Sequence, residues 1–232
     1  SLVHNDLIRK THPALHERIM RMVQAGRWEL IGNAWVEPDC NLGSGESLIR
    51  QFLRGFRFLD RYAGGRRSCA FFLPDSFGYP ASLPQILRGC GMRYFLTTKL
   101  SWNETSTFPY DTFLWRGIDG SEVLTHFNEI HCTPDPRTLR EKLGRGPHDY
   151  RSTENYIQHK DLNSMRLITY GFGDGGGGPK EEHLERALLL ENMEGMPKVK
   201  FGRADKFFER LAASDAVKNR KLCRWVGELY LE

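Results

Sequence analysis

The sequence FFLPDSFGYP, from Phe71 to Pro80, joins an apolar run to a tight turn rich in aromatic residues. The apolar residues before Asp75 predict a short strand that is buried on both faces. Asp75 therefore stands at the point where the strand ends. Two interpretations of its carboxylate follow: it caps the next helix, or it lies in a pocket and acts as a nucleophile or metal ligand.

The turn after Asp75 favours the pocket. Phe77, Tyr79 and Pro80 make the turn rigid and aromatic, as a wall that stacks on sugar rings would be. Gly78 allows a close approach of the backbone. Residue type and position alone leave helix capping as an equal alternative.

Strand-like and helical segments alternate along the rest of the chain. Ser44 is placed to cap an amphipathic helix, and Asp119-Gly120 predicts a hairpin turn between two aromatic-rich runs. Strands are predicted at residues 27–38, 69–75, 93–98 and 166–173, in both arms of 112–127 and at the start of 198–213. Helices are predicted at residues 11–26, 45–62, 82–91, 136–160 and 179–192 and at the end of 198–213. This order implies parallel strands with helices outside.

Polar groups lie at the ends of three of the predicted strands. Glu37 and Asp39 lie at the end of the first, Asp75 at the end of the second, and Asp174 directly after the strand that ends near residue 173. In folds with parallel strands, chemistry gathers where strands end and loops begin. Trp35, Glu37 and Asp39 occupy alternate positions, so a continued strand would turn all three to one face. That face suits hydroxyl-rich ligands, although a solvated strand end explains it nearly as well.

Asp174 lies in the loop GFGDGGGGP, whose glycines allow tight bending or close approach to a ligand. The loop lacks the GK[ST] ending of a P-loop and the GxGxxG order of a dinucleotide site, which disfavours phosphate binding. A loop without any site stays an alternative. Lys99 follows another strand and is placed to meet a polar ligand. His126 ends the run EVLTHF, where most histidines serve packing or hydrogen bonding.

Bulk properties set broader limits on function. The net charge of +4 is mild and spread along the chain, which argues against a nucleic-acid partner. The five cysteines are scattered without a CxxC pair, which disfavours a disulfide framework and favours a reducing, cytoplasmic location. No stretch approaches the length of a membrane span. Both ends look cut, so we expect residues 1–232 to be part of a longer protein.

Several stretches together resemble the catalytic domain of glycoside hydrolase family 38, the retaining α-mannosidases, and its bacterial and cytosolic branch in particular. They are GRWELIGNAWVEPDCN, SGESLIRQF, the long run from FFLPDSFGYP through SEVLTHF, and GFGDGGGGP. The resemblance spans roughly residues 25 to 180, and the long central run is its most specific part.

The resemblance implies a seven-stranded β/α barrel, of which residues 1–232 form a single domain that lacks at least the first strand. Asp75 takes the position of the catalytic nucleophile, which in this family also ligates an active-site zinc. Asp174 is the candidate acid/base. Trp35, Glu37, Asp39, Lys99 and His126 fall near the sugar-binding end, where a mannose-containing glycan would bind.

The chain departs from the family pattern in one respect. The family's other metal ligands lie in a His-x-Asp motif on the first strand and in a later helical region, and neither segment is present. His4 and Asp6 have the His-x-Asp spacing but a helical, surface context. We therefore expect this chain alone to bind zinc poorly and to be inactive. The alternatives are a polysaccharide deacetylase-like hydrolase, with Asp75 as a base, and an inactive carbohydrate-binding barrel.

Overall fold

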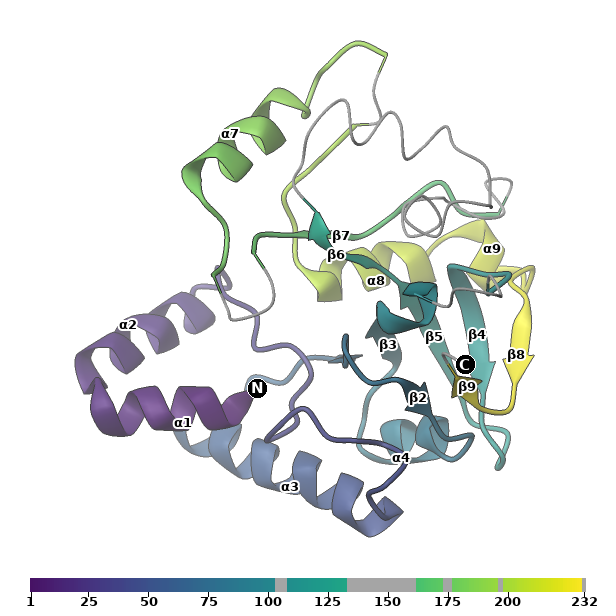
Figure 1. Ribbon diagram of the computed structural model, residues 1–232, viewed down its shortest axis with the longest axis horizontal. Coiled ribbons are helices and arrows are strands. Elements are labelled where there is room, and N and C mark those ends of the chain that lie inside the picture. Colours follow the sequence, from purple (N-terminus) through teal and green to yellow (C-terminus); the bar gives the residue numbers. More distant parts are fainter. Residues whose placement is uncertain (103–107, 133–161, 173–176, 196–197, 231–232) are drawn as a thin grey trace. The chain divides into compact units, whose positions relative to one another are not determined.

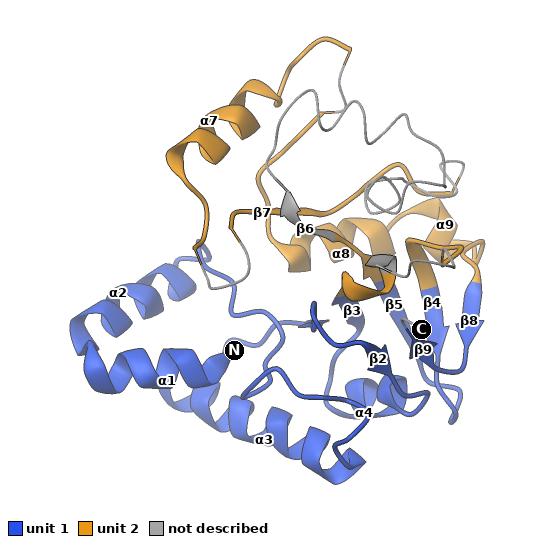
Figure 2. Ribbon diagram, viewed as in Figure 1, with its two compact units in different colours: residues 1–96, 114–125, 224–230 blue, residues 97–113, 126–223, 231–232 orange. Residues whose placement is uncertain are grey.

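The structure, a computed structural model, describes residues 1–102, 108–132, 162–172, 177–195 and 198–230 (Figure 1). The chain divides into two compact units (Figure 2). Unit 1 is formed by Ser1–Leu96, Leu114–Thr125 and Arg224–Tyr230, and unit 2 by Thr97–Phe113 and His126–Cys223.

Unit 1 begins with three helices, α1 (Leu2–Thr11), α2 (Pro13–Gln24) and α3 (Gly45–Tyr62). The prediction for α3 is confirmed in full, because the Ser44 hydroxyl accepts a hydrogen bond from the Ser47 amide at 3.2 Å. The three helices share an apolar core with the segments that follow them. Its buried members are Leu2, Ile19, Met20, Val23, Leu30, Phe58, Leu59 and Ala63.

The helix predicted at residues 11–26 begins slightly later than expected. His12 is the N-cap, since Pro13 lacks an amide hydrogen and its ring cannot continue α1. Gly26 has a φ of 71°, so the predicted glycine stop after α2 is confirmed.

A five-stranded sheet follows, in the order β1-β3-β5-β4-β8. The strands are β1 (Ala70–Phe72), β3 (Tyr94–Thr97), β4 (Thr112–Arg116), β5 (Glu122–Phe127) and β8 (Arg224–Val226). β1 pairs with β3 and β4 with β8 in parallel. The predicted hairpin places β4 beside β5, and because a short turn joins them these two strands run in opposite directions. The sheet is therefore mixed: the parallel strands implied by the strand-then-helix order are found in the pairs β1–β3 and β4–β8, and the predicted hairpin adds an antiparallel pair.

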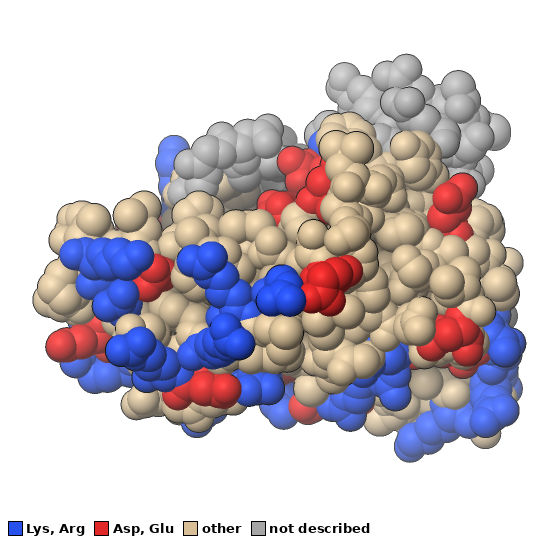
Figure 3. All heavy atoms as spheres, turned by 90° about the horizontal axis from the view of Figure 1, so that it is seen from below, with Lys and Arg blue, Asp and Glu red and all other residues tan. Residues whose placement is uncertain are grey.

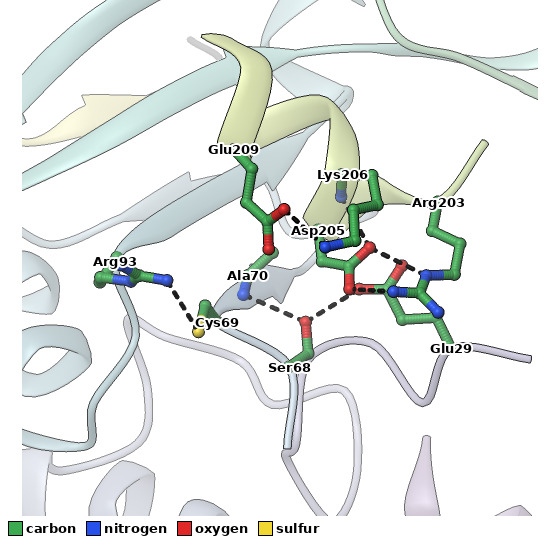
Figure 4. Close-up of polar contacts among 9 residues, drawn as sticks. All are labelled: Glu29, Ser68, Cys69, Ala70, Arg93, Arg203, Asp205, Lys206 and Glu209. Atoms are coloured by element: carbon green, nitrogen blue, oxygen red, sulfur yellow. Dashed lines mark hydrogen bonds and ion pairs between the residues drawn. The ribbon is translucent and has the colours of Figure 1, made fainter. Parts of the chain in front are cut away.

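Short elements complete unit 1: β2 (Gly78–Tyr79), the predicted helix α4 (Leu83–Gly89) and β9 (Leu229–Tyr230), which pairs antiparallel with β2. Polar contacts fix the entrance to β1 (Figure 4). The Ser68 hydroxyl donates to the Glu29 carboxylate and accepts from the Ala70 amide, both at 3.1 Å. These bonds hold the chain at Ala70, the first residue of β1.

The strand predicted at residues 27–38 is wrong. Gly32 and Asn33 have φ values of 94° and 59°, and two successive left-handed residues bend the chain out of an extended path. One sheet-like bond remains, from the Gly32 amide to the Ala70 carbonyl at 3.1 Å. The segment thus runs beside β1 without being a strand.

In its described residues, unit 2 contains β6 (Glu129–Cys132) parallel to β7 (Ile168–Tyr170), and four helical segments. These are the short 3-10 helix η1 (Lys99–Trp102) and the α-helices α7 (Glu181–Leu189), α8 (Ala204–Ala212) and α9 (Asp215–Lys218). At the start of α8, the Arg203 guanidinium binds Asp205 through two bonds of 3.0 and 2.7 Å (Figure 4).

The strand predicted at the start of 198–213 is wrong, since residues 198–203 form no ladder. The helix predicted at residues 136–160 lies outside the described residues. Within the part of the chain that is described, the sheet stays open and does not close into the predicted seven-stranded barrel. In that same part, no helix is long and apolar enough to cross a membrane.

Candidate active site

Asp75 lies just beyond β1, where the sequence places it. Phe71 and Leu73 are buried, and the Leu73 amide still donates to the Leu96 carbonyl at 3.0 Å. Pro74 then ends the pairing, because it has no amide hydrogen. The side chain of Asp75 is consequently exposed at the end of a buried strand.

The capping interpretation of Asp75 is excluded by the next helix. The N-cap of α4 is Ser82, well beyond Asp75 in the chain. The turn between them is held by Tyr79, whose buried hydroxyl donates to the Leu73 carbonyl at 2.8 Å. Phe77 is exposed on the same turn. The rigid, aromatic character of the turn therefore has a structural basis, and Asp75 is not the cap of α4.

Glu37 is brought to Asp75 although 38 residues separate them. The Glu37 carboxylate accepts a hydrogen bond from the Asp75 amide at 3.3 Å. Beside it, the Ser76 hydroxyl donates to the Pro38 carbonyl at 3.4 Å. Two of the three polar clusters predicted at strand ends, those of Glu37 and of Asp75, therefore meet within unit 1.

Asp39 and Trp35 do not share a face with Glu37 in the way an extended strand would require. The Asp39 carboxylate accepts from the amides of Asn41 and Leu42 at 2.8 and 2.7 Å, which stabilises a turn. Trp35 is half-buried, its ring packs edge-on against Phe58, and the Arg54 guanidinium lies 4.3 Å from its ring centroid. Their roles in sugar binding stay predictions.

Lys99 and His126 belong to unit 2. Lys99 is half-buried at the start of η1. His126 is fully buried: its Nδ1 lies 2.9 Å from the Thr112 hydroxyl, and its Nε2 accepts from the Leu167 amide at 3.3 Å. Burial, and secondarily the Arg166 cation, lowers the pKa of His126 well below its usual value. The imidazole is therefore neutral, and its predicted role in substrate binding stays a prediction.

A buried polar cluster that no sequence motif indicates surrounds His126. Asp111 and Arg166 form an ion pair of 3.5 Å in which both side chains are almost fully buried. In the same cluster, the side-chain amide of Asn163 donates a hydrogen bond to the Thr112 hydroxyl at 3.0 Å. These residues lie far apart along the chain, and no local motif signals that they meet.

The loop that carries Asp174 is closed at its base. Phe172 and Gly178 exchange two backbone hydrogen bonds of 2.9 and 3.1 Å. Gly171 has a φ of 124°, and a Cβ there would lie 2.9 Å from the Gly178 carbonyl carbon. Tight closure explains these glycines without a phosphate ligand. Asp174 itself lies outside the described residues, and its role stays a prediction.

No metal centre is formed within the described residues, where no three His, Cys, Asp or Glu side chains converge. His4 is exposed, and Asp6 pairs instead with Arg9 and Lys10 at 2.9 and 2.7 Å. Bonding to these two cations lowers the pKa of Asp6. These contacts support the interpretation of His4 and Asp6 as surface residues of a helix and not as metal ligands.

Charged side chains of both signs are interspersed on the face that Figure 3 draws. Ion pairs of the same kind occur on α3, where Arg50 contacts Glu46 at 2.7 Å and Asp60 contacts Arg67 at 2.8 Å. Such mixed surfaces differ from the concentrated basic footprint of nucleic-acid binders. The expectation of no nucleic-acid partner stays a prediction.

Comparison with known proteins places the chain in a family. Residues 4–228 match the model of the Glycosyl hydrolases family 38 N-terminal domain, and the chain belongs to this family. The resemblance inferred from the motifs is thereby confirmed.

Its relatives include two curated proteins with high coverage of this chain. Alpha-mannosidase G of Dictyostelium discoideum is 42% identical over 97% of this chain and 19% of that protein. Human Alpha-mannosidase 2C1 is 40% identical over 97% of this chain and 20% of that protein. The chain thus spans about a fifth of the length of these relatives.

The fold has a counterpart among solved structures. An alpha-mannosidase from Enterococcus faecalis V583 superposes with a TM-score of 0.71 and 19% identity, covering 97% of this chain and 24% of that one. This similarity supports an α/β fold with a mixed sheet like that of the Enterococcus protein.

Proposed function

We propose that this chain is part of the catalytic domain of a retaining α-mannosidase, which hydrolyses terminal α-D-mannosyl residues of glycans. Asp75 carries the proposal, because its exposed carboxylate follows a buried strand in a rigid turn within the family match. We propose further that residues 1–232 are one part of a seven-stranded β/α barrel, truncated at both ends and lacking at least the first strand.

In the proposed mechanism, Asp75 attacks the anomeric carbon and forms a covalent glycosyl-enzyme. Asp174 protonates the departing glycosidic oxygen and then removes a proton from the water that releases the sugar. The two carboxyl groups of retaining enzymes lie about 5 to 5.5 Å apart. Asp75 must be ionised while Asp174 must hold a proton, so the two need opposite environments.

For binding of the mannosyl group we propose Trp35, Glu37, Asp39, Lys99 and His126. Trp35 would offer an aromatic surface to the sugar, and the exposed carboxylate of Asp39 would accept bonds from its hydroxyls. Glu37 would contribute indirectly, through its hydrogen bond to the Asp75 amide. His126 is buried and bonded to its neighbours, so it would act from below the surface by fixing the end of β5.

Zinc belongs to the proposal, with Asp75 as one ligand. The described residues supply no cluster of three donors and therefore do not fit a metal centre by themselves. We expect the remaining ligands to come from outside these residues, and we expect activity only in the full-length protein. A cytoplasmic location is proposed from the scattered cysteines, of which Cys40, Cys69, Cys90 and Cys223 are free thiols in the described part of the chain.

Trapping of the covalent intermediate tests this proposal. The full-length protein would be incubated with a fluorinated α-mannoside and digested, and we expect a mannosyl adduct on the peptide that contains Asp75. Hydrolysis of p-nitrophenyl α-mannoside should be lost in Asp75→Asn. A deacetylase-like enzyme or an inactive sugar-binding barrel would give no adduct, and the names of the relatives do not favour either alternative.

A further inference from the structure

The turn that carries Asp75 depends on contacts from outside itself. Within the turn, the bond from the Tyr79 hydroxyl to the Leu73 carbonyl joins its two ends. The residues between them, where the Asp75 backbone lies, need other partners to hold one conformation. An exposed side chain can be placed accurately only if its backbone is fixed.

Residues 37–41 supply such partners. The Glu37 carboxylate accepts from the Asp75 amide, and the Pro38 carbonyl accepts from the Ser76 hydroxyl. Asn41 also lies close to the turn, since a Cβ at Gly78 would come within 2.7 Å of its side-chain nitrogen. Segment 37–41 therefore contacts the turn at three successive places.

Segment 37–41 is itself anchored. The Asp39 carboxylate binds two amides and closes a turn. Upstream, the Trp35 amide donates a hydrogen bond to the backbone carbonyl of Gln51 at 3.1 Å. The Val36 amide donates to the side-chain oxygen of the same Gln51, also at 3.1 Å. Gln51 lies within α3, so Glu37 is held relative to a regular helix.

We propose that Glu37 is a positioning residue, which fixes the backbone of Asp75 through a charge-assisted hydrogen bond. Its action on the reaction is indirect, because the bond reaches the Asp75 amide and not the reacting carboxylate. Hydrogen bonds with an ionised acceptor are roughly twice as strong as neutral ones. A misplacement of a reacting group by about 1 Å can cost about 100-fold in rate. The inference rests on the proposed function, which makes Asp75 the nucleophile.

The test compares Glu37→Gln with Glu37→Ala in the full-length protein. The burst of dinitrophenol from 2,4-dinitrophenyl α-mannoside measures the rate at which the glycosyl-enzyme forms. We expect Glu37→Ala to lower this rate about 10- to 100-fold with little change in KM, as positioning effects do. Glu37→Gln keeps an oxygen acceptor at the same place and should restore most of the rate. Ser76→Ala, which removes only the neighbouring bond, should give a smaller loss of the same kind.

Matched controls separate this role from others. Glu46→Ala removes a nearby exposed carboxylate on α3 that contacts Arg50, and it should leave the burst unchanged. Melting temperatures would verify that each variant is folded. If Glu37→Ala does not fold, the burst rate of Ser76→Ala is the deciding measurement. A raised KM with an unchanged burst rate would overturn the inference in favour of direct sugar binding. Equal losses in Glu37→Gln and Glu37→Ala, or no loss in Glu37→Ala or Ser76→Ala, would overturn it as well. Failure of the proposed function is distinct, since the wild type would then give no burst and no adduct, or Asp75→Asn would keep its activity.

Discussion

Substitution of Gly55 by alanine should destabilise unit 1. Gly55 lies in α3 with its Cα facing the Asn33 backbone, and a Cβ there would lie 1.8 Å from the Asn33 carbonyl oxygen. Normal contact distances require the Asn33 segment to move away by more than an ångström. Asn33 is fully buried, and its side chain donates to the Ser68 carbonyl at 2.7 Å and accepts from the Ser68 amide at 3.0 Å. Displacement would lengthen both bonds.

The expected cost follows from three contributions. Two hydrogen bonds contribute about 1 kcal/mol each, and overpacking of a tight contact costs about 2 kcal/mol. Alanine gains about 1 kcal/mol over glycine in a helix, which offsets part of the loss. We therefore expect Gly55→Ala to lower the free energy of unfolding by about 3 kcal/mol.

Urea denaturation followed by circular dichroism measures this difference. Gly89→Ala is the matched control, because Gly89 ends α4 and a Cβ there would meet nothing within 4 Å. The control should be neutral or slightly stabilising. If Gly55→Ala were as stable as Gly89→Ala, the close approach of α3 to Asn33 would be refuted.

Three further predictions follow from the site and the core. In the full-length protein, Asp75→Asn should lower kcat for p-nitrophenyl α-mannoside at least about 1000-fold, a loss expected for a missing nucleophile; wild-type turnover in this variant would contradict the assignment. Burial, and secondarily the Arg9 cation, lowers the pKa of His16, so its unfolded form binds the proton more tightly. The stability it contributes is present above about pH 6.5 and is lost as the pH falls below that value, with a slope of up to about 1.4 kcal/mol per pH unit. His16→Gln should reduce this slope in urea titrations between pH 5 and pH 7, and an unchanged slope would refute the role of burial. Zinc should leave the melting temperature of the 232-residue chain unchanged, because its described residues hold no cluster of three donors; a clear upward shift would show a metal site that these residues do not contain.

Features decided by neighbouring residues were predictable from the sequence. Ser44 caps α3 as expected, because the bond reaches only three residues ahead. The turn at Asp119-Gly120 forms as expected, since the Asp119 carboxylate accepts from the Ser121 amide at 2.9 Å. In both cases the partner lies within the same short segment, so local chemistry determines the outcome.

Features that depend on distant partners were not predictable. The segment at residues 27–38 has the alternation of a strand, but Asn33 adopts a left-handed conformation in which its side chain binds the distant Ser68. The buried pair of Asp111 and Arg166 likewise arises only when distant segments fold together. A pattern of residue types carries no information about such partners.

The meeting of Glu37 with Asp75 was predicted for a reason that holds only in part. We expected both groups at the ends of neighbouring strands, and the first segment is not a strand. The bond from the Gly32 amide to the Ala70 carbonyl nevertheless keeps that segment beside β1, so its polar end arrives where β1 ends. Asn33 directly follows Gly32, and the contact with Gly55 fixes its backbone. We therefore expect a change at Gly55 that moves Asn33 to shift Glu37 as well, four residues further along the same segment, which would link the packing of α3 to the position of Asp75.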